Sequence, residues 1–130
     1  MAKAIIQQIL PGGVQVAGPY SPAMSAGDTI YISGQIARDA SGNMVDDSIE
    51  NATAVALENL RAVLTAAGLT PANMVKSTVF MRDLEDFAGM NKAYAAFFGD
   101  HRPARSTIQV AKLPLNSRVE IEGIAVRTKK

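Results

Sequence analysis

The alternation of hydrophobic and polar positions along the chain predicts four strands. They cover residues 28–36, 74–81, 105–111 and 118–126. The first contains Gly34, a position at which another group can approach the backbone closely. Before these strands, apolar pieces at residues 4–9 and 14–17 are separated by a proline and two glycines, which favours a hairpin-like start.

Two helices are predicted between these strands because their apolar residues recur at helical spacing. The first begins at Asp47 or Ser48 in a pattern typical of a capping box, and Gly68 is placed to end it. The second follows Asp83, a candidate cap, and its apolar stripe contains Phe87, Met90, Tyr94, Phe97 and Phe98. Asn91 lies within this stripe. A buried amide without a partner costs about 1–3 kcal/mol, so Asn91 is expected to bond to backbone or to face a ligand.

The order of these elements favours an α+β fold in which both helices cover one face of a mixed sheet. A single domain of residues 1–130 accommodates them, and 48% hydrophobic residues suffice for its core. The other face of the sheet also carries apolar residues, among them Phe80, Ile124 and Val126. Two helices cannot cover both faces. We therefore expect a homo-oligomer in which the second face is buried against another subunit.

Charge and composition exclude several classes of function. With 13 basic and 12 acidic residues the net charge is +1, so no electrostatic field favours nucleic acid or an anionic membrane. The chain has no cysteine and one histidine, which argues against disulfides, thiolate catalysis and a metal site, and we expect no cofactor. No signal-peptide pattern opens the chain, so a cytoplasmic location is expected.

The last third of the chain concentrates the candidate chemistry. Arg105, Thr107 and Gln109 fall on one face of a predicted strand, and Glu120 and Glu122 share a face of the next. We expect the two strands to be adjacent, so that a guanidinium lies near a carboxylate. Arginine can hold a small carboxylate through two parallel hydrogen bonds, and a glutamate beside it can transfer protons.

Five segments of the chain resemble one known family. They are GPYSPA, ISGQI, NKAYAAFF, RPARSTIQVAKLP and VEIEGIAV. They closely resemble the reactive-intermediate deaminases, the Rid or YjgF-like family, over nearly the whole chain and in the same order. The resemblance implies a chorismate-mutase-like α+β fold that assembles as a homotrimer with a site in each cleft between subunits. It also implies hydrolysis of enamines and imines, notably 2-aminoacrylate and 2-aminocrotonate, to 2-oxo acids and ammonia.

The resemblance assigns roles to individual residues. Arg105 would hold the substrate carboxylate, and Glu120 would position and activate water. The family's pocket-lining positions are occupied here by Tyr20, Ser33 and Asn91. Thr107 stands where relatives frequently have cysteine, so this side chain is not a required nucleophile if the activity is kept, although its backbone can still bind substrate. The loop GDHRP before Arg105 is shorter than in some relatives, so the resemblance does not define the size of the substrate or the shape of the lid.

Most of these residues also admit a structural interpretation. Arg105 can pair with Glu120 or Glu122, and Glu122 with Arg118 or Arg127. The side chain of Tyr20 can simply fill the rigid loop GPYSP, and the hydroxyl of Ser33 can be satisfied within its strand. A lone histidine such as His101, beside Arg102 in a loop, is typically solvated. No serine lies in a nucleophile-elbow pattern, which argues against a Ser-His-acid triad.

Functions of other classes remain open at this level. A trimeric regulatory module could bind 2-oxo acids through Arg105 without turning them over. An endoribonuclease or translation-inhibitor role, reported for some relatives, is disfavoured by the balanced charge and the single histidine. A holdase chaperone is neither supported nor excluded by this composition.

Overall fold

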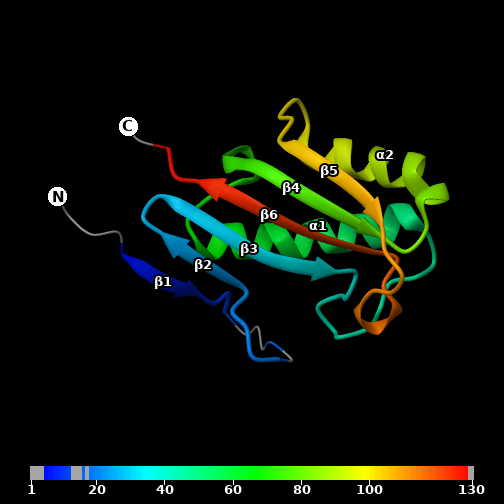
Figure 1. Ribbon diagram of the computed structural model, residues 1–130, viewed down its shortest axis with the longest axis horizontal. Helices are drawn as coiled ribbons and strands as arrows, with labels where there is room; N and C mark the ends of the chain where they lie inside the picture. The colour runs from blue at the N-terminus through cyan, green and yellow to red at the C-terminus, as the bar shows by residue number, and fades with distance from the viewer. Residues whose placement is uncertain (1–4, 13–15, 17, 129–130) are drawn as a thin grey trace.

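The computed structural model describes residues 5–12, 16 and 18–128. In these residues six strands form one mixed sheet, and two helices lie across one of its faces (Figure 1). The strands are β1 (Ile6–Ile9), β2 (Ala23–Ala26), β3 (Thr29–Ile36), β4 (Met74–Met81), β5 (Ala104–Gln109) and β6 (Val119–Val126). The helices are α1 (Ile49–Ala66) and α2 (Phe87–Phe98), with short 3-10 turns at Pro71–Asn73, Leu84–Asp86 and Pro114–Asn116. The predicted α+β class is therefore confirmed.

The strands follow the order β1-β2-β3-β6-β4-β5. The β4 and β5 strands are parallel because α2 carries the chain back between them, whereas the other neighbouring strands pair antiparallel. The prediction that β5 and β6 are neighbours is wrong, since β4 lies between them. The parallel β4-α2-β5 unit puts β5 at the edge of the sheet, and β6 returns to pair with β3 and β4.

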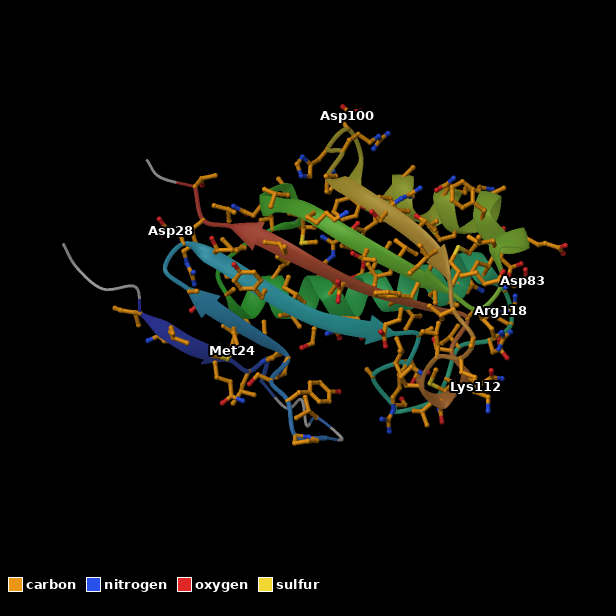
Figure 2. All side chains as sticks on the ribbon, in the orientation of Figure 1. Met24, Asp28, Asp83, Asp100, Lys112 and Arg118 are labelled. Atoms are coloured by element: carbon orange, nitrogen blue, oxygen red, sulfur yellow. The ribbon has the colours of Figure 1, made fainter. Side chains whose placement is uncertain are left out.

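The core lies between the helices and the sheet. Its largest fully buried side chains include Ile30, Leu57, Leu60, Leu64, Met74, Val79, Met81, Met90, Val119 and Ile121. Along β4 the side chains of Ser77, Val79 and Met81 are buried beneath the helices, and the intervening residues face the other way. The fold therefore rests on one apolar layer, while the face opposite the helices carries no further layer of the described chain (Figure 2).

The helices begin and end near the predicted capping residues, but Asp47 and Asp83 have other roles than the N-caps of α1 and α2. Ser48 is the N-cap of α1, because its hydroxyl accepts a hydrogen bond from the Asn51 backbone N–H at 3.1 Å. Asp47 instead accepts a bond from the Asn51 side chain at 3.0 Å. Asp83 caps the short turn Leu84–Asp86 that leads into α2. Gly68, with φ +77°, follows α1 in the left-handed conformation that glycine adopts readily.

The first strand has a different partner from the one expected. β1 pairs with β2, with Ile6 opposite Ala26 and Ile9 opposite Ala23. Most of the second apolar piece expected to form the hairpin, residues 14–17, lies outside the described residues. In the part of the chain that the structure describes, neither helix is long and apolar enough to cross a membrane.

Candidate functional site

Arg105 lies near the start of the edge strand β5, on the face that the helices cover. Its register partner on β4 is the buried Ser77. The guanidinium carbon lies 4.7 Å from the Tyr94 ring centroid and 5.7 Å from that of Phe87, and Nη1 lies 3.9 Å from the Met90 sulfur. Across the described residues the guanidinium forms no ion pair and donates to no oxygen. A half-buried cation thus retains its N–H donors for a ligand.

Asn91 and Thr107 lie beside this arginine. Asn91 is four residues from Phe87 and three from Tyr94, so it shares the helix face of the two rings that flank Arg105. Thr107 lies two residues beyond Arg105 and projects from the same face of β5. Asn91 Oδ1 and Thr107 Oγ1 are buried and have no hydrogen-bond partner among the described residues. Together with Arg105, they form what we term the Arg105 cluster.

The two atoms without partners indicate a polar role for these positions. A buried oxygen that finds no donor costs about 1–3 kcal/mol, and most such atoms in folded proteins are satisfied. A third example, Thr53 Oγ1, lies in α1 and belongs to no candidate site. For the Asn91 side-chain oxygen, the expected hydrogen bond to backbone is not formed within the described residues.

Glu120 lies on β6, on the face of the sheet opposite the helices. It pairs in register with Phe80 on β4 and Ile36 on β3. Its carboxyl group rests against Gly34, where an added Cβ would stand 2.7 Å from the Glu120 Cδ. The predicted close approach to Gly34 is thus confirmed, and the approaching group is the candidate catalytic carboxyl. Burial, and secondarily the charge of Glu122, raise the pKa of Glu120 above its usual range.

The Arg105 and Glu120 side chains therefore lie on opposite faces of the sheet. Arg105 shares a face with Ser77, whereas Glu120 shares a face with Phe80, and residues an odd number apart on one strand point oppositely. The expectation that one chain holds the two side chains together is wrong because β4 separates β5 from β6. The alternative ion pair of Arg105 with Glu120 or Glu122 is likewise not formed.

Tyr20 and Ser33 belong to the Glu120 side of the molecule through one loop. The Ser33 hydroxyl donates to the Ser21 carbonyl at 2.6 Å, and its backbone N–H donates to the Pro22 carbonyl at 2.9 Å. The loop that carries Tyr20 is held by these bonds, and the Tyr20 ring itself is 53% exposed. Because Ser33 precedes Gly34, the loop is anchored next to the residue that Glu120 contacts. Glu120, Gly34, Ser33 and Tyr20 form what we term the Glu120 cluster.

Comparison with known proteins identifies the chain's relatives. A profile of the family described as Endoribonuclease L-PSP matches residues 13–127. The chain belongs to the Rid (YjgF-like) family. A Rid relative from Salmonella typhimurium, named 2-iminobutanoate/2-iminopropanoate deaminase, is 41% identical over 98% of this chain and 99% of its own length.

Solved structures agree with this family assignment. A Thermotoga maritima protein described as a putative endoribonuclease has a TM-score of 0.89 and 42% identity, with 95% of this chain and 98% of that chain covered. Escherichia coli TdcF with bound serine has a TM-score of 0.82 and 38% identity, with 98% and 100% of the two chains covered. At these identities the Rid fold of the present chain is established.

Some residues in this Rid chain have partners that the sequence did not predict. Tyr94, expected only in the core, forms a 2.7 Å hydrogen bond between its hydroxyl and that of Ser77. His101, expected to be solvated, is half-buried, and its Nε2–H donates to the Met74 carbonyl at 2.6 Å. In the sequence, Tyr94 could have been singled out only because it lies in the NKAYAAFF segment that resembles the family. No local sequence pattern predicted the partner of His101.

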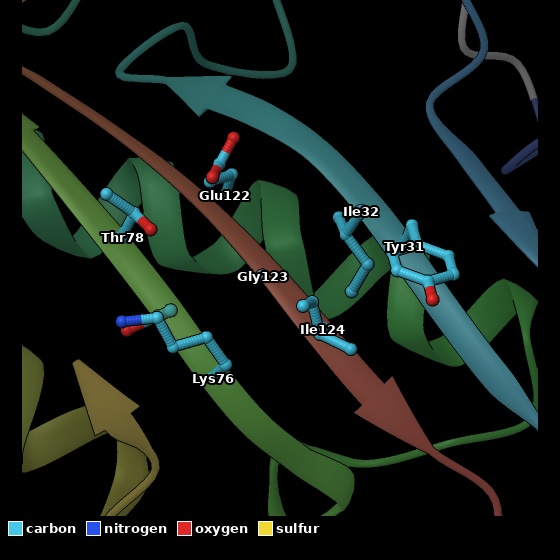
Figure 3. Close-up of a pocket in the computed structure, with 8 residues that line it drawn as sticks. Tyr31, Ile32, Lys76, Thr78, Glu122, Gly123 and Ile124 are labelled. Carbon is cyan, nitrogen blue, oxygen red and sulfur yellow. The ribbon is translucent and has the colours of Figure 1, made fainter. Parts of the chain in front are cut away.

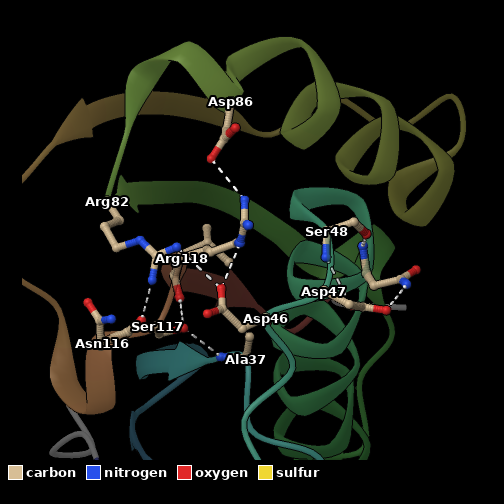
Figure 4. Close-up of polar contacts among 11 residues, drawn as sticks. Ala37, Asp46, Asp47, Ser48, Arg82, Asp86, Asn116, Ser117 and Arg118 are labelled. Atoms are coloured by element: carbon tan, nitrogen blue, oxygen red, sulfur yellow. Dashed lines mark hydrogen bonds and ion pairs between the residues drawn. The ribbon is translucent and has the colours of Figure 1, made fainter.

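The expected partners of Glu122 are also wrong. Arg118 bonds to Asp46 at 2.7 Å and to Asp86 at 3.3 Å (Figure 4). Arg127 donates to the backbone carbonyls of residues 27 and 67. Glu122 is exposed and lines a hollow of about 230 Å³ on the face opposite the helices. The other side chains around it include Tyr31, Lys76, Thr78 and Ile124 (Figure 3). No group of three acidic or histidine side chains within the described ranges could hold a metal ion.

Proposed function

We propose that this protein hydrolyses reactive enamines and imines of small 2-amino acids, such as 2-aminoacrylate and 2-aminocrotonate. The products are 2-oxo acids and ammonia. The observation that carries the proposal is the half-buried Arg105 guanidinium, which has no acidic partner in the described chain. Relatives named 2-iminobutanoate/2-iminopropanoate deaminase, such as the one from Salmonella typhimurium, support it. A small metabolite is the partner, and neither nucleic acid nor a membrane is involved.

The reaction needs little beyond positioning and proton transfer. The enamine becomes the imine when its terminal carbon gains a proton and its amino nitrogen loses one, and the imine nitrogen is then protonated. Water adds to the carbon of the C=N bond and loses a proton, and the adduct expels ammonia as the C=O bond of the oxo acid forms. A positioned acid/base contributes about 10²–10⁴-fold to such a step without a cofactor.

Arg105 and Glu120 divide this work. Arg105 holds the substrate carboxylate through its planar pair of donors, so that the reacting carbon faces a fixed direction. Glu120 takes a proton from water and returns one to the leaving nitrogen. The raised pKa of Glu120 suits this exchange, because a carboxyl group whose pKa lies closer to physiological pH can both accept and release a proton there. Tyr20, Ser33, Asn91 and Thr107 complete the substrate pocket.

The site joins two copies of the chain. Since Arg105 and Glu120 lie on opposite faces of one sheet, a substrate can contact both only if they come from different subunits. We place the sites between the subunits of a homotrimer, whose contacts also cover the sheet face opposite the helices. The protein acts in the cytoplasm, where pyridoxal-phosphate-dependent dehydratases release the enamine substrates.

The test is ammonia and pyruvate release while a dehydratase generates 2-aminoacrylate in the assay. We expect the wild-type protein to accelerate release, Arg105→Ala to abolish the acceleration, and Arg105→Lys to lose most of it because lysine lacks the planar fork. Folding of each variant is checked by circular dichroism. Near-normal turnover by Arg105→Lys would contradict two-point binding of the carboxylate.

A second candidate is a regulatory module that binds 2-oxo acids without turnover. The TdcF structure with bound serine favours it, because serine is a small amino acid with a carboxylate of the kind that Arg105 would hold. Binding of 2-oxobutanoate by a folded wild-type protein that accelerates no deamination would select this function. Its loss in Arg105→Ala would still assign the carboxylate to Arg105.

A further inference from the structure

A buried hydrogen bond lies directly beneath the Arg105 guanidinium. Tyr94, on α2, and Ser77, on β4, join their hydroxyl groups at 2.7 Å. The Tyr94 ring is 6% exposed, Ser77 is fully buried, and the ring centroid lies 4.7 Å from the guanidinium carbon. Ser77 is also the residue opposite Arg105 in the β4–β5 register. Three elements of the fold thus meet at one arginine.

We infer that Tyr94 and Ser77 are positioning residues, which fix the plane of the Arg105 guanidinium so that its two-donor edge faces the substrate carboxylate. The inference rests on the proposed function of Arg105 and extends it to residues that touch no substrate. Its basis is the convergence of the stacked ring, the buried hydrogen bond and the strand register on this one side chain.

The remaining contacts of Arg105 cannot fix this plane. An arginine is ordinarily oriented by bidentate hydrogen bonds to a carboxylate, and none is present within the described residues. The Met90 sulfur, 3.9 Å from Nη1, is a weak acceptor, and Phe87 is more distant than Tyr94 and is 40% exposed. Tyr94 therefore supplies the closest aromatic face, and Ser77, the hydrogen-bond partner of its hydroxyl, holds that face in place.

The chemistry of the phenol favours the same arrangement. Burial raises the pKa of Tyr94 above its ordinary value, although its bond to Ser77 and the nearby arginines oppose the rise. The hydroxyl therefore stays protonated at neutral pH. A phenolate beside Arg105 would act as an internal counterion and would compete with the substrate carboxylate. A neutral ring instead attracts the guanidinium through its face without neutralising it.

The test removes the hydroxyl pair while keeping the ring. We measure Kd for 2-oxobutanoate, and for its uncharged amide, with wild type, Tyr94→Phe and Ser77→Ala. Each substitution is expected to raise Kd for 2-oxobutanoate about three- to tenfold, as loosening a cation–π contact would. Binding of the amide should not change. In turnover assays KM should rise by the same factor with kcat within about twofold, since both variants keep Arg105 itself and weaken only its hold on the carboxylate.

A double-mutant cycle separates positioning from general destabilisation. If Tyr94 and Ser77 act through Arg105, then Tyr94→Phe and Ser77→Ala should have no further effect on binding in an Arg105→Ala background. Ser25→Ala is the matched control, because Ser25 is a buried strand serine on β2, which β3 and β6 separate from β4. It should leave Kd unchanged. Circular dichroism confirms folding, and Ser77→Ala serves as an independent variant should Tyr94→Phe fail to fold.

The outcomes distinguish this inference from the proposed function. Weakened binding in Arg105→Ala, but not in Tyr94→Phe or Ser77→Ala, would overturn the positioning role and leave the proposed function standing. Equal effects on the carboxylate and the amide, or an undiminished effect in the Arg105→Ala background, would also overturn it. A wild-type protein that neither binds nor hydrolyses these compounds would overturn both.

Discussion

The Arg105 cluster and the Glu120 cluster contrast in how the fold builds them. Arg105 lies on the helix-covered face, at an edge strand, and is surrounded by the side chains of Phe87, Met90 and Tyr94 from α2. Glu120 lies on the opposite face, on an inner strand, and its carboxyl rests against the backbone of Gly34. Within residues 5–12, 16 and 18–128, one cluster offers a cation without an anion, and the other offers a carboxyl group without a cation.

This contrast explains why one chain cannot carry out the proposed chemistry alone. The contacts that hold each charged group in place come from its own chain. Each lacks the partner that the other provides. A catalytic site divided in this way depends on assembly, and the following predictions test that division, beginning with the largest expected effect.

Mixing two inactive variants should restore activity. Arg105→Ala and Glu120→Ala should each lower kcat/KM about 10²-fold or more. The first removes the group that positions the substrate, and the second removes the group that transfers protons. When the two chains are co-expressed at equal levels in one oligomer, about a quarter of the sites should pair an intact Arg105 with an intact Glu120 from a neighbour. We therefore expect about a quarter of wild-type activity in the mixed oligomer.

The control for this experiment is a mixture in which one chain carries both substitutions and the other is an Arg105→Ala chain. No site in that mixture has an intact arginine, so activity should stay at the level of Arg105→Ala alone. Absence of recovery in the first mixture, with mixed oligomers verified by mass spectrometry, would contradict a site shared between copies.

Gly34→Ala should disable the Glu120 cluster while leaving the fold intact. The new Cβ would meet the end of the Glu120 side chain at 2.7 Å, so the carboxyl is expected to swing aside rather than the backbone to move. Gly34 is not among the glycines with positive φ, and alanine therefore fits its backbone. We expect kcat/KM to fall about ten- to a hundredfold, since misplacement by ~1 Å can cost that much.

Gly12→Ala is the matched control for this substitution, because no atom of the residues that the structure describes lies within 4 Å of its added Cβ. It should leave both kcat/KM and Tm unchanged. An unaltered rate in Gly34→Ala would show that the position of Glu120 against Gly34 has no bearing on catalysis.

The sequence predicted what is locally encoded and failed where distant segments meet. The strand 74–81 and the positions of both helices were predicted correctly, because side-chain periodicity repeats within each element. The buried stripe of α2 was predicted correctly for Met90, Tyr94 and Phe98 and wrongly for Phe87, which is 40% exposed. Alternation also placed Arg105 with Thr107, and Glu120 with Glu122, on shared strand faces. The insertion of β4 between β5 and β6 depends on long-range pairing, which no local pattern specifies.

The same limit applies to the polar contacts. Arg118 finds its partner Asp46 across 72 residues of sequence, and His101 finds the Met74 carbonyl across 27. The helical spacing of Tyr94 predicts a core position but does not indicate the hydrogen bond between its hydroxyl and that of Ser77. The residue types of the candidate site could therefore be predicted, whereas the division of that site between two faces required the pairing of the strands.

Glu122→Gln should lower the pKa of Glu120. The charge of Glu122 contributes to the raised pKa, second to burial, so its removal makes ionisation of Glu120 easier. The limb of the pH profile of kcat/KM that reports Glu120 should move to lower pH. The direction follows from removing a negative charge and holds whether or not an arginine of another copy lies nearby.

Glu58→Gln is the control for this profile. It makes the same charge change on the exposed surface of α1, where Glu58 pairs with Arg61. It should leave the profile in place. A limb that moves to higher pH in Glu122→Gln, or moves equally in both variants, would contradict the assignment of that limb to Glu120.

The smallest expected effect concerns the ion pairs of Arg118 with Asp46 and Asp86, which lie outside both clusters. Asp46 bonds to Arg118, which lies just before β6 and also reaches Asp86, the residue before Phe87 (Figure 4). The pKa of Asp46 is held below its usual range, chiefly by its hydrogen bond to Arg118. Asp46→Asn should lower the free energy of unfolding by at most about 1 kcal/mol at neutral pH, because the Asp46 side chain is exposed and water screens its ion pairs.

The pH dependence of this difference has a defined sign. Because folding lowers the pKa of Asp46, its contribution is fully present above the ordinary pKa of an aspartate and disappears as the pH falls through the lowered value. Denaturant unfolding of wild type and Asp46→Asn, at one fixed protein concentration, should therefore converge in acid. Since Asp46 contacts neither Arg105 nor Glu120, kcat/KM should stay unchanged. A marked loss of activity in Asp46→Asn would instead show that the two clusters are coupled through Arg118 and Asp86 within one chain.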